Sequence, residues 1–477
     1  MSHGPQHPPG ESLEAQRVDG YLAFLFVLLS TATLFDGFDA AMLTVAAPDV
    51  RETLSIGLDQ WSYLFAFTRL GMVGSFFFLL FADRFGRRML MMLTIVGFAL
   101  FNAATAFATT MEELALYQFG ARLFLTAEYA LAIIMVGEEF PARLRGRAIA
   151  ILTSFATAGV MVIAKLHPYI LLEGCESGSA AAGDCVPPES NALRDLGLEI
   201  VAWGQGLLGQ PVDGADWRVL YLLGGIPLVI VFGLRFAMRE TRRFEATQEG
   251  SGAKARESFG EAVRRELKNA RVPFEPRYRS RSILVALLWN CVHIVTAPAV
   301  AFWVIYVREE LGFSPHVVGD ILFWGYAGGV AGHFVAGALI DRIGRKPVCA
   351  ALYVFAAIAI FLLFQVRTVP LQYMTLIATV FGFGAANTAT HVYASELYPT
   401  EIRATGYGWT TNLLGRVAEV GVPLVVGTFV TTLGLSWSVG VVAFGPIVGA
   451  ILVLRYAPET KGLTLEEIES VVGSPTR

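Results

Sequence analysis

Long apolar runs separated by short polar segments constrain this chain more than any other feature. A run of about 20 apolar residues is long enough to cross a lipid bilayer as a helix. The 477 residues are 55% hydrophobic and 16% charged, whereas soluble domains are about a quarter charged. The sequence therefore predicts an all-α membrane protein with twelve transmembrane helices, at residues 20–47, 60–82, 89–109, 113–137, 147–170, 217–238, 281–307, 316–340, 348–366, 370–395, 404–432 and 435–456.

Basic residues are concentrated in alternate loops. The loop between the second and third spans holds three of them, and residues 239–281 hold twelve Lys or Arg. The opposite loops hold few, and short loops rich in Lys and Arg lie on the cytoplasmic side of a membrane. We therefore expect both termini to be cytoplasmic, in a bacterial-type inner (plasma) membrane.

The spans also define the expected domains. These are a cytoplasmic N-terminal tail (1–19), a six-helix bundle (20–238) with an external loop (171–216), a central cytoplasmic linker (239–280), a second six-helix bundle (281–456) and a cytoplasmic C-terminal tail (457–477). Residues 196–208 are expected to form an interfacial helix, and the charges around residues 261–268 favour a surface helix. Cys175 and Cys185 share the external loop, where an oxidising compartment would allow a disulfide. Cys291 and Cys349 are expected to be packing residues.

A charged loop motif occurs twice. The segment 83–88 (DRFGRR) returns 258 residues later as 341–346 (DRIGRK), and a Glu, Pro, Arg pattern after the fourth span returns at the same offset. Two motifs at one offset indicate an internal duplication. The Asp of each loop can pair with the Arg of the second motif and hold a closed state, although these charges could also serve only as topology anchors. The predicted gating residues are Asp83, Arg84, Arg87, Arg88, Glu138, Arg145, Asp341, Arg342, Arg345, Glu396 and Arg403.

The repeated loop and the two six-span halves resemble the major facilitator superfamily, whose halves are related by internal symmetry. The segment 337–346 matches the loop pattern of that family, and 458–462 (PETKG) is similar to its sugar-porter and organic-ion branch. The first span contains Asp36-Gly37-Phe38-Asp39, which resembles the signature of aromatic-acid proton symporters. The fourth span and residues 138–147 resemble the wider metabolite proton symporter and synaptic-vesicle-like branches. The resemblance implies two pseudo-symmetric six-helix bundles (the major facilitator fold) and proton-coupled transport by alternating access.

Charged residues inside the membrane are costly and usually functional. Asp36 and Asp39 lie three residues apart, on one face of a helix. Asp39, Arg69 and Arg122 each lie roughly 12 to 15 Å inside their spans, at a rise of about 1.5 Å per residue. A carboxylate that is both buried and close to an Arg can change protonation as water access alternates. We therefore expect Asp36 and Asp39 to carry or control the proton, with Glu128 as a relay or an interhelical strut.

A guanidinium near the middle of the membrane suits a carboxylate substrate. Arg416 lies roughly 18 Å inside the eleventh span, where it should face the pocket with Asn412 while Glu419 turns away. A Glu419 on the same face would instead make the pair structural and weaken the case for an anionic substrate. Arg122 is expected to face the same anion, and His293 could bond substrate or proton. The other predicted substrate-binding residues are Asn387, Trp289, Trp409 and Tyr326, for which helix packing or an interfacial position is the alternative.

The sequence contains no Cys/His cluster with metal-ligand spacing, no phosphate-binding loop, no dinucleotide fingerprint and no nucleophile elbow. It therefore predicts no cofactor, no metal, no enzymatic activity, no ATP-driven pumping and no nucleic-acid partner. The favoured function is proton symport of a small organic acid, an aromatic acid being one candidate. The alternatives are a sugar or polyol proton symporter and a proton-driven exporter of drugs or metabolites. The expected partners are the small-molecule substrate, protons and the lipid bilayer, and a monomer is expected.

Overall fold

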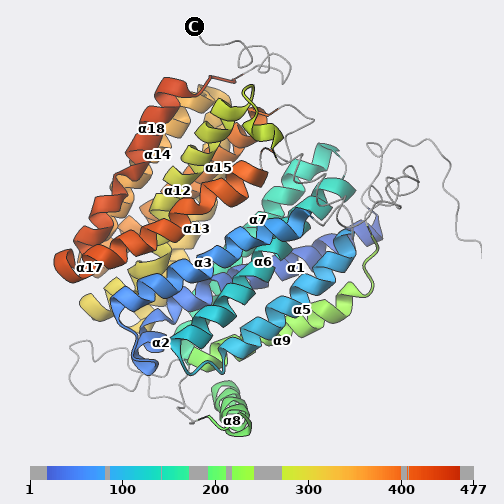
Figure 1. The fold of residues 1–477 in the computed structure, drawn as a ribbon, viewed down its shortest axis with the longest axis vertical. Helices are drawn as coiled ribbons and strands as arrows, with labels where there is room; N and C mark the ends of the chain where they lie inside the picture. The colour runs from blue at the N-terminus through green and yellow to red at the C-terminus, as the bar shows by residue number, and fades with distance from the viewer. Residues whose placement is uncertain are drawn as a thin grey trace, which may run out of the picture.

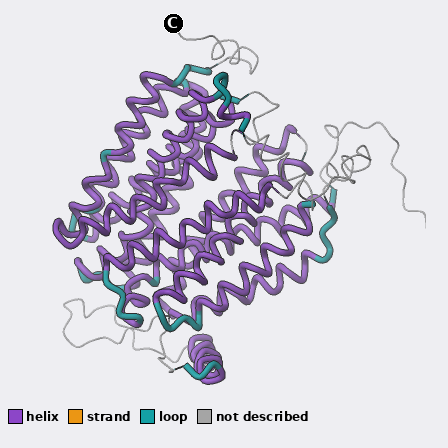
Figure 2. The backbone as a smooth tube through the Cα atoms, in the orientation of Figure 1, coloured by secondary structure: helices purple, strands orange, loops and turns teal. Residues whose placement is uncertain are grey.

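The computed structural model describes residues 19–80, 86–140, 142–170, 192–210, 217–240, 271–398, 406 and 408–461. Within these ranges the chain is mostly helical and contains no strand (Figures 1 and 2). The first ten predicted spans correspond to the helices α1 (Gly20–Val45), α3 (Leu58–Leu80), α5 (Arg87–Thr105), α6 (Met111–Glu139), α7 (Ala142–Ile170), α9 (Trp217–Arg235), α12 (Arg279–Ile305), α13 (Pro315–Ile343), α14 (Arg345–Leu363) and α15 (Val369–Glu396).

The last two predicted spans lie in one helical stretch, Gly408–Tyr456. It contains a π turn, η5 (Gly408–Leu413), a 3-10 turn, η6 (Leu414–Arg416), and the helices α17 (Val417–Ala443) and α18 (Gly445–Tyr456). Gly434 has φ 71° and ψ 170°, a conformation that glycine adopts without steric cost. It interrupts the helix at the predicted boundary between 404–432 and 435–456. Ten described stretches are long and apolar enough to cross a membrane, and together with α3 they account for the twelve predicted spans.

Capping residues explain where several helices begin. The carboxylate of Asp19 accepts a hydrogen bond from the backbone N–H of Leu22 at 2.7 Å, at the start of α1. Thr110 caps α6 in the same way through the N–H of Glu113. Ser314 precedes α13 and is followed by a proline at the first helical position. Each cap satisfies one of the backbone donors that a helix N-terminus leaves without a partner.

Two shorter helices lie between the spans. The sequence did not predict α2 (Ala47–Thr53), which follows α1 directly. In contrast, α8 (Ala192–Leu207) matches the helix expected at 196–208. It lies at the edge of the bundle in Figure 1 and packs on α9. Leu196, Ile200 and Trp203 are exposed on α8, at the spacing of one helix face. The helix expected around residues 261–268 lies outside the described residues.

The helices form two groups. One comprises α1, α3, α5, α6, α7 and α9, and the other runs from α12 to α18; in Figure 1 the first group is blue to green and the second yellow to red. The groups meet where α13 packs on α7 and α17 packs on α3. This arrangement is the expected two-bundle fold.

Glycines allow α1 and α7 to pack backbone against backbone. A Cβ at Gly37 would lie 1.8 Å from the carbonyl oxygen of Ala156, and a Cβ at Gly159 would lie 1.9 Å from that of Leu34. No side chain fits at either position, and small residues are what close approach of membrane helices requires. The glycine in the Asp36–Asp39 motif therefore sets the position of both carboxylates.

Ion pairs join the two bundles at one end of the molecule, which we call the α2 face. Arg51 pairs with Glu309 and Lys165 with Asp320, while Arg308 contacts Asp49 at 3.0 Å. Arg51 and Glu309 are 258 residues apart, the same offset as the repeated loops. These pairs lie on the side that the sequence predicts to be external.

Candidate functional site

The carboxylates of α1 are buried where the sequence places them. Asp36 is 5% exposed and Asp39 is 2% exposed. Within the described part of the chain, both carboxylate oxygens of Asp39 and one of Asp36 are buried without a hydrogen-bond partner. Burying a charge without such a partner is costly. Binding a proton would neutralise each carboxylate and remove this cost.

Arg122 lies beside Asp39. Its Nη2 donates to the backbone carbonyl of Ala40 at 3.1 Å and to that of Asp39 at 3.5 Å. The guanidinium therefore bonds to the backbone of α1, and no hydrogen bond to the Asp39 carboxylate is recorded among the described residues. Arg122 fixes α6 to α1 and supplies a positive charge close to Asp39.

Glu128 takes part in a buried ion pair. Its carboxylate pairs with both terminal nitrogens of Arg235, one at 2.9 Å, and accepts a hydrogen bond from the hydroxyl of Thr94. Arg235 also donates to the carbonyl of Met91 at 2.7 Å. The pair joins α6 to α9 and α5. Of the two roles predicted for Glu128, this environment favours the interhelical strut.

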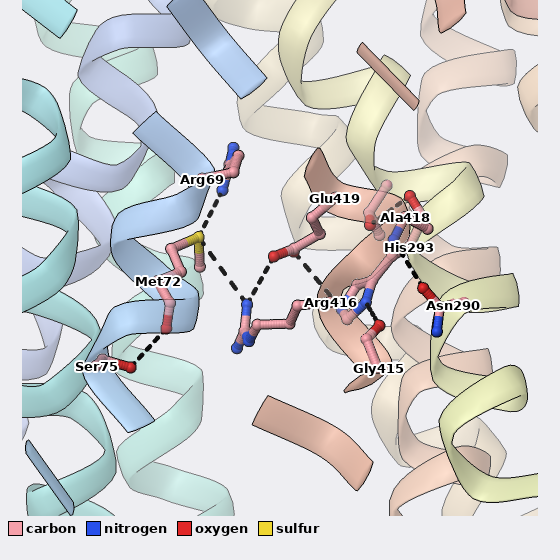
Figure 3. A network of polar contacts seen from close by, with 10 residues as sticks. Arg69, Met72, Ser75, Asn290, His293, Gly415, Arg416, Ala418 and Glu419 are labelled. Carbon is pink, nitrogen blue, oxygen red and sulfur yellow. Dashed lines mark hydrogen bonds and ion pairs between the residues drawn. The ribbon is translucent and has the colours of Figure 1, made fainter. Parts of the chain in front are cut away.

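A second group of charges lies between the bundles (Figure 3). We call Arg69, His293, Arg416 and Glu419 the central cluster. Arg416 Nη1 is 2.8 Å from Glu419 Oε2, and His293 Nε2 is 3.6 Å from Glu419 Oε1. Arg69 comes from α3 of the first bundle, and its Nη1 is 3.2 Å from the sulfur of Met72. Arg416 Nη1 is 4.0 Å from the same sulfur.

The orientation predicted for Glu419 is wrong. We expected the eleventh span to turn Arg416 toward the pocket and Glu419 away from it, but the two side chains form an ion pair. Residues three apart are neighbours on one face even of a regular α-helix, so the spacing itself favours the pair. Arg416 ends the 3-10 turn η6, and Glu419 lies in the first turn of α17. Arg416 therefore already has an acidic partner within the protein.

Asn290 supports this irregular turn, and the sequence analysis missed it. Its side-chain nitrogen donates to the carbonyl of Leu414 at 2.8 Å, and its oxygen accepts from the N–H of Ala418 at 2.7 Å. These bonds satisfy backbone groups that a regular helix would pair internally. An amide inside the seventh predicted span was the available signal.

Two buried arginines were missed as well. Arg218 is fully buried, and its Nη1 donates to the carbonyls of Ala106 and Ala108 at 2.9 and 2.7 Å. Arg218 and Arg235 lie near the two ends of the sixth predicted span, where a basic residue is expected at the membrane surface. The position of an arginine at the end of a span does not show whether neighbouring helices bury it.

The other predicted binding residues lie in the second bundle. Trp289 stacks on His293 with ring centroids 5.7 Å apart and contacts the ring of His391 at 4.6 Å. Trp409 contacts the ring of Phe76, in the first bundle, at 5.0 Å. The indole nitrogens of both tryptophans are buried and lack a hydrogen-bond partner in the described residues. The remaining predicted positions, Tyr326, Asn387 and Asn412, are half-buried.

The described ends of the repeated loops lie where α1 begins and α18 ends, an end of the molecule that we call the termini face. Glu240 accepts hydrogen bonds from the backbone N–H groups of Arg87 and Arg88, at the start of α5. Glu459 does the same for Arg345 and Lys346, at the start of α14, with both distances 3.0 Å. Each carboxylate therefore caps a helix N-terminus, where the helix dipole favours an anion.

Glu459 belongs to the PETKG motif, and its environment favours the charged form. Partial burial raises the pKa of its carboxyl group, but the backbone N–H groups of Arg345, Lys346, Lys461 and Thr460 lower it further, so that the pKa lies below its usual value. Nearby, Arg345 Nη2 contacts Glu396 Oε1 at 3.0 Å. Lys461 donates to the carbonyl of Arg342 at 2.7 Å.

Several predicted residues cannot be located in this way. Asp83, Arg84, Arg403, Cys175 and Cys185 lie outside the described residues, as do the side chains of Glu138, Arg145 and Asp341. The predicted pairs of Asp83 with Arg145 and of Asp341 with Arg403 therefore remain predictions. Cys291 and Cys349 are buried and free, in agreement with a packing role.

Comparisons with known proteins identify the family. A family model for the "Sugar (and other) transporter" matches residues 199–472, and one for the "Major Facilitator Superfamily" matches residues 29–181. The chain is similar to the putative niacin/nicotinamide transporter NiaP of Bacillus subtilis (strain 168), with 23% identity over 438 residues, which are 91% of this chain and 95% of the relative. It is also similar to the gallate transporter of Pseudomonas putida, with 24% identity over 445 residues, 89% of each chain.

Among solved structures, the crystal structure of D-xylose-proton symporter has a TM-score of 0.70 and 16% identity, covering 93% of this chain and 100% of that one. This likeness concerns the fold. The first family model covers more than half of the sequence. The chain is therefore an integral membrane transporter rather than an enzyme, and it belongs to the sugar (and other) transporter family within the major facilitator superfamily.

Proposed function

We propose that this protein is a proton-coupled symporter that carries a small organic acid across the membrane by alternating access. The observation that carries this proposal is the central cluster, in which Arg69 of one bundle and Arg416 of the other face the boundary between the bundles. A planar guanidinium there suits a carboxylate, and carriers of this fold bind substrate near the midplane. One relative is named for niacin and nicotinamide and another for gallate, and of these compounds niacin and gallate bear a carboxylate.

The proton would be carried by Asp36 and Asp39. Both are buried without full hydrogen bonding, and the free energy of such a carboxylate falls when it binds a proton. Arg122 would bias this equilibrium from its place beside Asp39. Opening the site to one side of the membrane and then to the other would let the two carboxylates load and release the proton.

A sugar or polyol proton symporter is the second candidate. The family description and the likeness to the D-xylose-proton symporter favour it. In that case the half-buried amides Asn387 and Asn412 and the unpartnered indole of Trp289 would bond sugar hydroxyls. Among the residues that the structure describes, Glu419 alone would then balance the charge of the two arginines beside a bound neutral sugar, which is why we favour an anionic substrate.

Uptake into proteoliposomes with an imposed pH gradient distinguishes these functions. We expect accumulation of nicotinate or gallate, little uptake of the neutral nicotinamide, and none of D-xylose. An uncoupler should abolish accumulation but leave exchange of labelled for unlabelled carboxylate. Preference for nicotinamide or D-xylose, or carboxylate movement that ignores the pH gradient, would contradict the proposal.

Replacement of the carboxylates tests the proton path. Asp36→Asn and Asp39→Asn should each abolish proton-driven accumulation while the purified protein keeps its melting temperature, because the amide removes a titrating group without removing volume. Glu112→Gln, at an exposed position of α6, is the matched control and should transport like the wild type. Accumulation against a gradient in both single Asn variants would contradict the assignment.

The remaining assignments follow from this cycle. We propose that both termini face the cytoplasm of a bacterial-type cell, that the chain acts as a monomer, and that the repeated loops gate the termini face while the α2-face ion pairs gate the other. With the α2-face pairs formed, the site would exchange substrate with the termini face. Labelling of single cysteines introduced on each face of intact cells tests this orientation.

A further inference from the structure

The central cluster has an unequal balance of charge. Arg69 and Arg416 provide two permanent positive charges, and His293 can add a third, but Glu419 is the one carboxylate recorded with an ion pair to any of them in the described residues. Arg69 contacts the Met72 sulfur and lies over the ring of Phe65, with 4.5 Å from the guanidinium carbon to the ring centroid. Neither contact neutralises a cation.

The two guanidinium groups are spaced for one carboxylate. Both contact the sulfur of Met72, which lies between them in Figure 3, so their Nη1 atoms are at most about 7 Å apart. The two oxygens of a carboxylate are about 2.2 Å apart, and hydrogen bonds of about 2.8 Å on either side let it join donors up to about 8 Å apart. A substrate carboxylate can therefore bond Arg69 and Arg416 at once by moving the flexible Met72 side chain.

Glu419 competes for the same place. Its Oε2 already accepts from Arg416 Nη1 at 2.8 Å. A substrate carboxylate bonded to Arg416 Nη1 would come within roughly 5 Å of the Glu419 carboxylate. At an effective dielectric constant of about 20, the repulsion between these two charges lowers the affinity for the substrate about a hundredfold. Protonation of Glu419 would remove this repulsion and release Arg416.

His293 is placed to share that proton. Its Nδ1 lies 2.6 Å from the carbonyl oxygen of Gly415, which can only accept, so Nδ1 carries a hydrogen. The neutral ring then presents an unprotonated Nε2 to Glu419, 3.6 Å from Oε1. Without a further proton, the lone pair of His293 Nε2 would face the negative carboxylate of Glu419. A proton on either Nε2 or the carboxylate removes this repulsion.

We propose that Glu419, together with His293, is a second proton site, and that the substrate carboxylate binds between Arg69 and Arg416 as Glu419 takes up a proton. The proton comes from the aqueous side to which the site is open and leaves when the substrate leaves. This inference rests on the proposed function, because it assumes a carboxylate substrate. It assigns to the second bundle a proton-binding role additional to that of Asp36 and Asp39.

Other titratable and charged groups face this site, and they could also make binding depend on pH. Arg416 interacts electrostatically with Tyr129 of α6 and with His391 of α15, while Arg69 interacts with Arg122 of α6 and Tyr326 of α13. Glu419 itself faces Arg69, His293 and Arg416. The decisive comparison therefore changes Glu419 alone.

The test is equilibrium binding of nicotinate or gallate, whichever is the better substrate, to purified protein between pH 5 and pH 8. In the wild type we expect affinity to rise as the pH falls. Glu419→Gln should bind at pH 8 about a hundredfold more tightly than the wild type, with little pH dependence, because its side chain is always neutral. Glu112→Gln should behave as the wild type.

Two further measurements keep the proposal falsifiable should Glu419→Gln fail to fold. Carboxylate binding to the Asp36→Asn/Asp39→Asn protein in weak buffer should still take up protons. Arg69→Gln should weaken binding at every pH, whereas Arg367→Gln, an exposed loop variant, should not. Unchanged pH dependence in Glu419→Gln, no proton uptake by the double Asn protein, or no effect of Arg69→Gln would each overturn this inference. If the wild type binds no carboxylate at any pH, it is the proposed function that fails.

Discussion

Removing one partner of the Glu128–Arg235 pair should destabilise the protein strongly. Glu128 is 2% exposed and Arg235 is fully buried, so Glu128→Gln would leave a guanidinium without a counter-ion inside the first bundle. Breaking a buried ion pair in this way costs about 3–5 kcal/mol. The double variant Glu128→Gln/Arg235→Gln leaves no unpaired charge, and we expect it to recover a large part of that loss.

The measurement is the free energy of unfolding of the four proteins in detergent, analysed as a double-mutant cycle. Glu112→Gln, on the same helix but exposed, is the control and should change stability little. We also expect the double variant, once reconstituted, to keep proton-driven uptake, since the pair serves as a strut. Single variants as stable as the wild type, or a stable double variant that has lost coupling, would refute this reasoning and favour a proton relay through Glu128.

Three further predictions concern other parts of the chain. Gly159→Ala should lower the free energy of unfolding by about 1–3 kcal/mol or more in thermal melts, because the added Cβ would lie 1.9 Å from a carbonyl oxygen of α1. The control is Gly233→Ala in α9, where an added Cβ meets nothing within 4 Å. This variant should be neutral or stabilising. Cys175 and Cys185 should form a disulfide worth up to about 2–3 kcal/mol, and equal thiol labelling before and after reduction would exclude it. The lowered pKa of Glu459 means that its charge stabilises the folded state above the usual Glu pKa of about 4.3 and ceases to do so as the pH falls through the folded value. The difference in melting temperature between wild type and Glu459→Gln should therefore be constant above that pH and shrink below it; a difference that grows in acid would contradict the cap.

The sequence was sufficient for the spans because length and apolar composition decide them. The predicted boundary between 404–432 and 435–456 also falls where the structure breaks the helix, at Gly434. The burial of Asp36, Asp39 and Arg122 followed from their positions deep inside predicted helices. These predictions depend on one element at a time, which is why they were confirmed.

The contacts that the sequence missed depend on pairs of distant elements. From its position in the sequence Arg235 is a residue at the end of a span, and its burial depends on α5 and α6, which pack against it. The partner of Arg51, Glu309, lies in the other bundle and cannot be inferred from the neighbouring sequence. The predicted separation of Arg416 from Glu419 was wrong for a different reason. Residues three apart in a helix are neighbours on one face, so the spacing itself favoured the ion pair that the structure contains.

The ion pair between Arg51 and Glu309 has a consequence for the history of the chain. The two residues occupy equivalent positions in the two repeats and contact each other, so they lie close to the axis that relates the bundles. In an ancestor made of two identical subunits, the same position would have met its own copy, Arg against Arg or Glu against Glu, and like charges would have repelled one another across the axis. Opposite charges at this point require two halves that mutate independently. The pair could therefore arise only after the gene had been duplicated into two copies that mutate independently, and a symmetric dimer of either present half would carry a repulsive contact at the axis.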